Sequence, residues 1–476
     1  MQLSFLHKVQ PACGAGFSLK ARHFACAALA GSVVFSSPRP ALAGDASKSA
    51  APVESTSIWE KPAWMTDLSL GVKESYDSNI YLSGAGPEYF PKTIPEGDIA
   101  TKNKSSWVTT ISPKIGADFA KLLGSDSIVK LFTVGYVPDF VVFHAASSET
   151  YASHRVTTVF KAQADNVTVA IDNAFTYING SDDGLIYPGG SSCFVQSSVR
   201  ERREQWQDRL KTSVKIDLGP VFVRPTVSLL YYDLATNFKN ISGYSNYVDR
   251  YDVNGGADVG YNVTKDVALT LGYRYGTQYQ QTLPFDLSQI SASNDYQRVL
   301  FGVEGSPLQW LKIEAAVGPQ FTTYTGNRPC NGGVAADGLI DQNTADVYAE
   351  ASVSMALTPA DTLVFRYKRW NWVSSTGKNA YLDVLYDASY RHQITKALQW
   401  ELGLRAAQAD YNPSSIRNDW DYTVSTGFRY AFTKNLSMDV AYSYDKGRNA
   451  EDNVIVIGPT REFERSIVST GLTWKF

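Results

Sequence analysis

The stretch from Val267 to Gln280, VALTLGYRYGTQYQ, changes character at every residue. Its odd-numbered positions are apolar or aromatic, with one Thr, and its even-numbered positions carry Ala, Thr, Gly, Arg, Gly, Gln and Gln. Because successive side chains of a β-strand point to opposite faces, the pattern predicts a strand with one apolar and one polar face. A tilted strand of about 9–11 residues crosses a membrane, so this segment is long enough to span one.

The same alternation recurs along most of the chain. Leu398 to Leu404 and Leu436 to Tyr444 show it clearly, whereas Leu131 to Val142 is apolar on both faces and contains Pro138. About eighteen such segments are predicted, with sixteen possible. They begin near Asp67, Ser106, Ser127, His154, Val167, Gln205, Val221, Asp249, Val267, Asp295, Leu311, Ala345, Thr362, Ala380, Leu398, Asp419, Leu436 and Glu464.

The connections between these segments alternate between short and long. Turns such as Pro359-Ala360-Asp361 and Thr433-Lys434-Asn435 interleave with long polar stretches such as 180–204 and 327–344. Short turns on one rim and long loops on the other are typical of an outer-membrane barrel. We therefore predict an all-β fold over residues 64–476: an antiparallel transmembrane β-barrel with short periplasmic turns and long extracellular loops. A soluble sandwich would also alternate, but its strands are usually shorter.

Composition excludes several other classes. The chain has 476 residues, a formal net charge of −3, 28 Tyr and only four Cys. It lacks the apolar runs of about 18 residues that transmembrane helices need, and it has no basic surplus of the kind that marks nucleic-acid binders. Four cysteines are too few for a disulfide scaffold.

The first 43 residues have the features of a secretory signal peptide. Lys8, Lys20 and Arg22 precede an apolar stretch from Phe24 to Phe35, and Ala41-Leu42-Ala43 forms a cleavage site. Removing residues 1–43 would take four basic and no acidic residues, changing the formal net charge from −3 to −7. Residues 44–63 are polar and rich in Ala, Ser and Pro, which predicts a flexible periplasmic extension before the barrel.

The last eight residues, STGLTWKF, resemble the C-terminal recognition signal of Gram-negative outer-membrane proteins, carried here by Gly471, Trp474 and Phe476. The resemblance implies insertion by the barrel assembly machinery and an integral location in the outer membrane, in contact with its lipid. The opening strand LSLGVKESYDSNIYL and repeats such as GFRYAFTKNLSMDVAYSYDKG resemble, more loosely, the families named putative β-barrel porin.

Barrel size favours a transport function. Sixteen to eighteen strands leave an aqueous channel. The leading hypothesis is a porin for passive diffusion of small hydrophilic solutes, with a homotrimer possible. The alternatives are a polysaccharide or other polymer export channel and a structural barrel sealed by its loops. We predict no enzyme, cofactor or metal site, because the predicted mature chain holds only His144, His154 and His392, without metal-ligand spacing.

Strand parity places charged residues on the face toward the lumen. A basic set is predicted on one wall: Arg155, Lys161, Arg209, Lys211, Lys215, Arg224, Arg274 and Arg298. An acidic set is predicted on the opposite wall: Asp346, Glu350, Asp383, Asp387, Glu401, Asp421 and Asp439. One hypothesis is a transverse field that sets ion preference. The alternative is that opposite charges pair and have no selective role.

Three further features bear on the pore. The loop 180–204 is a candidate constriction element, although a surface loop is the default. Its Cys193 and the later Cys330 are the only cysteines after the predicted signal peptide and could form a disulfide. The sequence Arg369-Trp370-Asn371-Trp372 is interpreted as part of an interfacial girdle or surface patch, with sugar stacking as the alternative.

Overall fold

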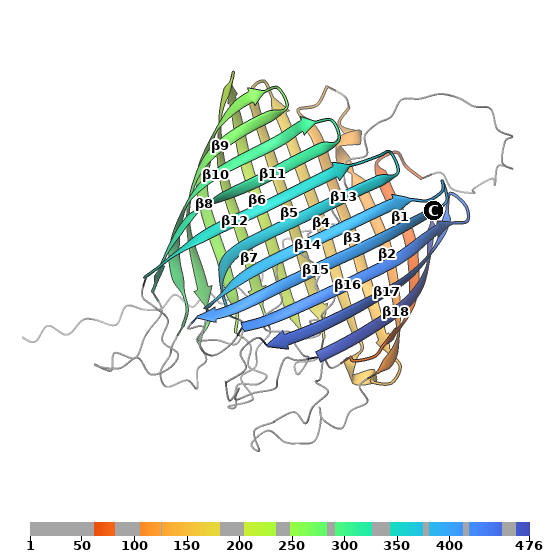
Figure 1. The fold of residues 1–476 in the computed structure, drawn as a ribbon. Helices are drawn as coiled ribbons and strands as arrows, with labels where there is room; N and C mark the ends of the chain where they lie inside the picture. Colours follow the sequence, from red (N-terminus) through yellow and green to blue (C-terminus); the bar gives the residue numbers. More distant parts are fainter. Residues whose placement is uncertain are drawn as a thin grey trace, which may run out of the picture.

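The computed structural model describes residues 61–80, 105–124, 126–180, 204–234, 248–282, 291–325, 343–374, 380–412, 418–449 and 463–476. Eighteen strands make up almost all of this (Figure 1). They are β1 Met65–Asp77, β2 Ser106–Asp118, β3 Val129–Phe143, β4 Tyr151–Ala164, β5 Val167–Asn179, β6 Gln205–Leu218, β7 Val221–Asp233, β8 Arg250–Thr264, β9 Val267–Gln280, β10 Asn294–Leu308, β11 Leu311–Tyr324, β12 Asn343–Ala356, β13 Asp361–Val373, β14 Ala380–Gln393, β15 Leu398–Asn412, β16 Asn418–Ala431, β17 Leu436–Asn449 and β18 Phe463–Lys475. Two short 3-10 helices, η1 Phe119–Leu122 and η2 Ser147–Glu149, follow β2 and β3.

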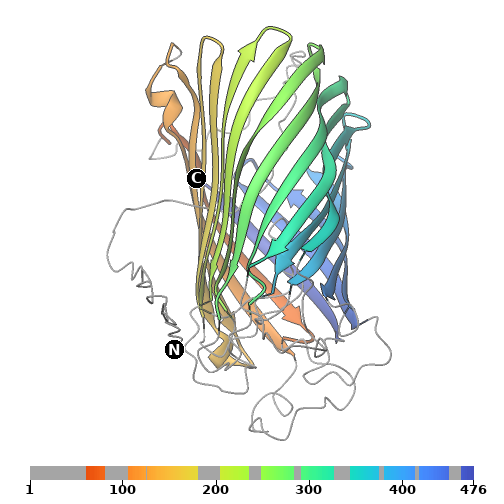
Figure 2. The ribbon, with the colours of Figure 1, turned by 90° about the vertical axis from the view of Figure 1, so that its left-hand side faces the viewer.

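The strands form a closed antiparallel barrel. Each strand pairs with its neighbours along the chain, and β1 also pairs with β18, from Ser69↔Lys475 to Asp77↔Ile467. The strands tilt together around the barrel wall (Figure 2). Closure gives every strand a partner on both sides, which is what a sheet needs in order to cross a bilayer.

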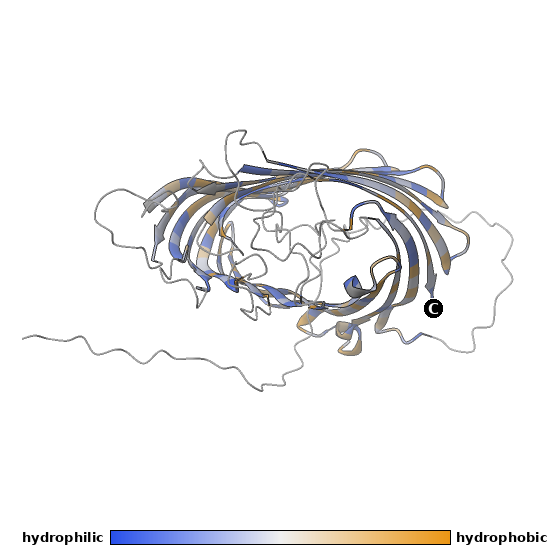
Figure 3. Ribbon diagram, turned by 90° about the horizontal axis from the view of Figure 1, so that it is seen from below, coloured by the Kyte–Doolittle hydropathy of each residue, from blue (hydrophilic) through white to orange (hydrophobic). Residues whose placement is uncertain are grey.

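The two faces of the wall differ in chemistry. On β9, Leu269, Leu271 and Tyr273 point outward and are about half exposed, whereas Gly272 and Arg274 point inward. Seen along the barrel, apolar and polar residues are interspersed along the strands of a flattened ring (Figure 3). The outer face therefore suits lipid and the inner face suits water.

Connections of different length define two rims. The turn between β4 and β5 is Asp165-Asn166, and that between β6 and β7 is Gly219-Pro220. Asp165 and Gly219 have positive φ, 48° and 84°, as tight hairpin turns often require. We call the rim that carries these turns the short-turn rim. The opposite one, where β13 ends and β14 begins, is the long-loop rim.

The predicted fold class is confirmed, with eighteen strands. Every observed strand begins within three residues of its predicted start; the largest difference is at β4, which begins at Tyr151. Within the described residues no helix is long and apolar enough to cross a bilayer. Residues 1–60 lie outside the described part, so the signal peptide and the extension over 44–63 remain predictions.

Candidate functional site: a bridge across the barrel interior

All fifteen predicted lumen charges lie on inward-facing strand positions. Arg209 pairs across the sheet with Leu230, and Asp383 pairs with Trp370, both of which are buried inside the barrel. The register places the others on the same face. The basic members lie on β4, β6, β7, β9 and β10, and the acidic members on β12 and β14–β17.

On the basic wall, most cations are paired with nearby acids. Arg209 lies 3.1 Å from Asp172 and Lys215 lies 2.9 Å from Asp217. Further ion pairs join Arg155 to Asp139, Arg224 to Asp258 and Glu304, and Arg274 to Asp258. Except for Glu304 on β10, which reaches Arg224 on β7, these acids are on the same or neighbouring strands, so much of the positive charge of this wall is neutralised locally.

The acidic wall is compensated only in part: among the described residues, Asp346, Asp387 and Glu401 form ion pairs, whereas Glu350, Asp383, Asp421 and Asp439 form none. Asp387 lies 3.0 Å from Arg366 and 3.9 Å from Arg405. Glu401 pairs with Arg391 at 3.0 Å. Such close pairing favours the alternative of locally paired charges over a field between two oppositely charged walls. Among the described residues, Lys161 and Lys211 form no ion pair.

The ends of β13 and β14 at the long-loop rim depart from the regular wall. Pairing between β12 and β13 runs only from Ala349↔Arg369 to Ala356↔Thr362, whereas β13 stays paired with β14 up to Val373↔Ala380. We call residues 370–374 and 380–385 the bridge. Its members on both strand faces are buried; those at most 8% exposed are Trp370, Asn371, Trp372, Val373, Ser374, Ala380, Tyr381, Asp383, Val384 and Leu385.

Three hydrogen bonds tie the bridge to strands on the other side of the interior. Arg250 on β8 donates from Nη1 to the carbonyl of Val373 at 2.7 Å. Two glutamines of β9 donate from Nε2 to bridge carbonyls: Gln278 to Asn371 at 2.9 Å and Gln280 to Ser374 at 2.7 Å. Because these strands are not sheet neighbours of β13, the contacts span the barrel interior.

Aromatic rings fill the space around these bonds. Trp372 is fully buried and stacks on Trp370, with ring centroids 4.9 Å apart. Its ring lies 6.4 Å from that of Tyr232 on β7, and the Arg250 guanidinium is 5.0 Å from the Trp372 ring. A guanidinium this close to an aromatic ring makes a cation–π contact, which is strongest when desolvated.

A second cluster fills the neighbouring end of the interior, beside β10–β12. Arg298 is buried between the rings of Tyr296 and Tyr348, at 4.1 and 4.2 Å. Its Nε donates to Gln320 at 2.7 Å, and Tyr296 donates to Asp252 at 2.9 Å. The aromatic faces are therefore already covered by cations of the chain itself.

The girdle interpretation of Arg369–Trp372 is wrong for both tryptophans. Trp370 and Trp372 lie on the inward-facing parity of β13, together with Arg366 and Lys368, and are buried inside the barrel. Since Arg366 and Lys368 share the even-numbered positions of β13 with both tryptophans, the sequence could have indicated that the tryptophans face inward. The residues that receive the bridge, Arg250, Gln278 and Gln280, carry no distinguishing sequence signal.

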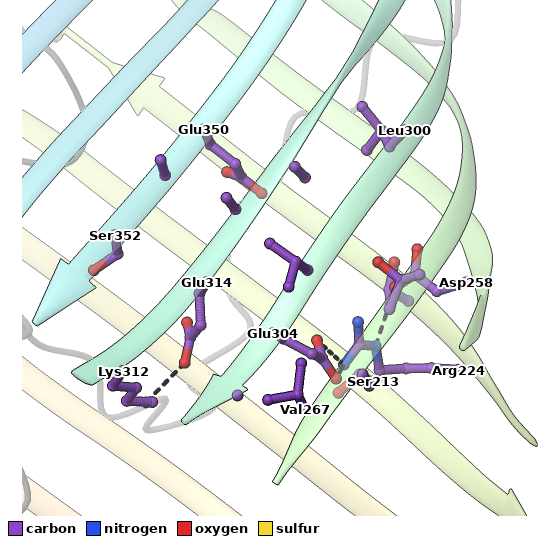
Figure 4. A pocket seen from close by; sticks show the side chains of 18 of the residues that line it. Ser213, Arg224, Asp258, Val267, Leu300, Glu304, Lys312, Glu314, Glu350 and Ser352 are labelled. Atoms are coloured by element: carbon purple, nitrogen blue, oxygen red, sulfur yellow. Dashed lines mark hydrogen bonds and ion pairs between the residues drawn. The ribbon is translucent and has the colours of Figure 1, made fainter. Parts of the chain in front are cut away.

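A cavity of about 660 Å³ extends on the short-turn side of the bridge. It is lined by residues of β6–β14, among them Lys211 and Leu385. Glu350 and Ser352 of β12 line it as well (Figure 4). The close-up shows Arg224 held between Asp258 and Glu304, and Lys312 beside Glu314. Its wall therefore carries mostly paired charges, with the Lys211 ammonium among the exceptions.

The predicted assembly residues lie on the last strand. Trp474 and Phe476 are about half exposed, on the lipid-facing side, and Gly471 faces inward beside the carboxylate of Asp439. Residues 181–203 of the predicted loop constriction, which include Cys193, lie outside the described residues, as does Cys330. Within the described part, no group of three or more His, Cys, Asp and Glu is arranged to hold a metal ion.

Comparison with known proteins gives a family match for the C-terminal part. Residues 340–476 match the family described as Putative beta-barrel porin 2. No curated protein shows significant similarity to the chain. Among solved structures, OpdK of Pseudomonas aeruginosa with vanillate is similar at 10% identity, over 86% of this chain and 98% of that one, with a TM-score of 0.39.

Two other solved structures are similar to the same extent. OccAB3 of Acinetobacter baumannii has 10% identity over 86% of this chain and 99% of that one, with a TM-score of 0.38. OccK2 (OpdF) of Pseudomonas aeruginosa has 9% identity, over 86% and 98%, with a TM-score of 0.39. The C-terminal part that holds β12–β18 is thus similar to a β-barrel porin family, and the described strands close into the kind of antiparallel barrel that crosses the outer membrane.

Proposed function

We propose that this barrel is a porin through which small hydrophilic solutes diffuse passively. The observation that carries the proposal is a closed ring of eighteen strands with a polar, charged inner face. Barrels of this size enclose an aqueous channel, whereas eight strands would be filled by side chains. The family match over residues 340–476 supports a channel rather than an enzyme.

The bridge would act as the sieve of this pore. It joins β13 and β14 to β8 and β9 and, with the Arg298 cluster, fills the part of the interior beside β10–β12. The path for solutes then runs past it, along β14–β18 and β1–β6. Paired charges on both walls speak against a polymer export channel, which would use one sign of charge or a free aromatic track.

Liposome swelling with sugars of graded size tests this function. We expect uptake by vesicles that contain the purified chain, with a rate that falls steeply as the sugar grows, because the bridge narrows the lumen. Vesicles without protein are the control. If no sugar enters, the sealed structural barrel is the better description.

The lumen charges predict a change in ion preference. Replacing Arg209, Lys211 and Lys215 together by Gln should shift the reversal potential in a salt gradient toward cation selectivity. Asp172 and Asp217 would lose their partners and the charge of Lys211 would disappear. As a control, neutralising both members of the Arg391–Glu401 pair leaves the net charge unchanged and should leave the reversal potential unchanged. An unshifted reversal potential in the triple variant would show that these cations have no role in selectivity.

A porin of this kind would have two protein partners, the barrel assembly machinery and other copies of the same chain. We propose that the barrel assembly machinery recognises β18, with the exposed Trp474 and Phe476 as its contact residues. We also propose that the barrels associate in the membrane as a homotrimer. Residues 1–43 would be removed during export.

A further inference from the structure

The outer face of β4–β6 differs from the rest of the lipid-facing surface. Its orientation follows from the register: on β6, Trp206 is exposed on the outside, and Asp208 lies on the same face two residues on. Asn173 on β5 is outward-facing as well, since it pairs with Leu210 of β6. Asn173 is the central residue of β5, which runs from Val167 to Asn179.

A polar cluster therefore lies on the outside of the barrel, from the middle of β5 to Asp208, the fourth residue of β6. Asn173 Nδ2 donates to Asp208 Oδ1 at 2.7 Å, and Thr158 of β4 stands directly opposite Asn173 in the ladder. Among the described residues, no donor lies within hydrogen-bonding distance of Asn173 Oδ1. On most other strands the outward mid-strand positions are apolar or aromatic and about half exposed; examples are Val227, Tyr273, Phe301, Val317 and Val424.

Lipid tails offer this cluster nothing to bind. An amide or carboxylate that faces hydrocarbon without a full set of hydrogen bonds is strongly disfavoured, so it is usually covered by protein. The cost disappears when a protein surface of matching chemistry supplies donors.

A matching donor lies on the adjoining strand. His154 on β4 faces outward and stacks between the rings of Tyr136 and Tyr177, at 6.2 and 6.0 Å. Its Nδ1 is hydrogen-bonded to the Tyr136 hydroxyl at 2.9 Å. Nε2, on the other side of the ring, is thus the His154 atom left for an outside partner. His154 pairs with Tyr177, and Asp208 pairs with Phe175, so the two lie two residues apart along β5.

We propose that the outer face of β4–β6 is the surface through which copies of this chain associate, with β5 facing the symmetry axis. Around such an axis β4 of one copy lies against β6 of the next, which brings the imidazole of one chain to the carboxylate of another. This inference rests on the proposed association of the barrels and specifies where it occurs.

Cysteine cross-linking in the membrane tests the surface. In a chain carrying Cys193→Ser and Cys330→Ser, Ile171→Cys places one thiol on the outward face of β5, beside Asn173. Val424→Cys places a thiol on the outward face of β16, also at mid-strand, as the matched control. On oxidation, we expect a covalent two-chain species from Ile171→Cys and only single chains from Val424→Cys. Cross-linking from neither position, from both equally, or from Val424→Cys alone would overturn the proposal.

A second variant separates association from the pore. Asn173→Leu combined with Asp208→Leu should convert a multi-chain particle into a single chain in mild detergent, as measured by mass, while sugar uptake in liposomes is kept. Wild-type particles that already hold one chain with bound lipid, or an unchanged mass for the variant, would contradict the proposed surface. Neither outcome affects the porin proposal, which depends on sugar uptake alone.

Discussion

Replacing Trp372 by alanine should increase single-channel conductance severalfold and admit larger sugars. Trp372 is a fully buried residue of the bridge. Its ring packs against the facing strands β7 and β8, where it contacts Tyr232 and Arg250. Truncation removes the aromatic packing that holds the bridge against the facing wall. The measurement is conductance in a planar bilayer, together with the size limit in liposome swelling.

The same change should also lower stability. Truncating a buried tryptophan typically costs about 3–5 kcal/mol, so the yield of folded barrel has to be measured alongside. Gln278→Ala with Gln280→Ala offers a milder route, because it removes two of the cross-interior hydrogen bonds and leaves the rings in place. Trp107→Ala, on the outer face of β2, is the control for the loss of an indole ring. Unchanged conductance and size limit in both bridge variants would show that the bridge does not limit the pore.

The second large effect is expected at the seam where the barrel closes. The Arg465 side chain on β18 is 1% exposed; its Nη2 lies 2.7 Å from Asp77 on β1, and its Nη1 lies 3.7 Å from Asp445 on β17. Arg465→Met would remove the Arg465 guanidinium from beside two buried carboxylates. Breaking a buried ion pair in this way costs about 3–5 kcal/mol, which should appear as a loss in the free energy of unfolding.

A surface pair on the same two strands provides the control. Lys446 on β17 lies 2.7 Å from Glu464 on β18, but both side chains are about half exposed. Lys446→Met should therefore cost about 1 kcal/mol or less. Adding Asp77→Asn and Asp445→Asn to Arg465→Met should restore part of the lost stability. If Arg465→Met and Lys446→Met lowered the free energy of unfolding equally, burial of the Arg465 ion pairs would not determine how much they stabilise the barrel.

Period-two alternation was enough to predict the strands and their faces. It depends only on backbone geometry, which is the same in every barrel. Even the weakest segment, β3, was placed correctly. Pro138 there lies opposite Pro113 of β2, in a gap of the ladder between Ile111↔Phe140 and Ile115↔Tyr136. Neither proline has an N–H to donate, and because the two lie opposite each other, the hydrogen bonds are missing at one place in the ladder. The two strands therefore remain paired before and after the prolines.

The bridge could not be predicted in the same way. Parity tells which face a side chain is on, but not how far apart two facing walls lie. Trp372 and Arg250 meet only because the ring is flattened and β13 separates from β12 beyond Arg369. The pairing of the charges also depends on the register between neighbouring strands. Arg209 contacts Asp172 on β5, and strand parity allows this contact but does not predict it.

Single-channel recording of the unaltered chain in a planar bilayer tests the central claim most directly. A water-filled path past the bridge predicts discrete, stable current steps in potassium chloride, smaller than those of Trp372→Ala. A correctly folded barrel that inserts into the bilayer and passes no current would contradict it.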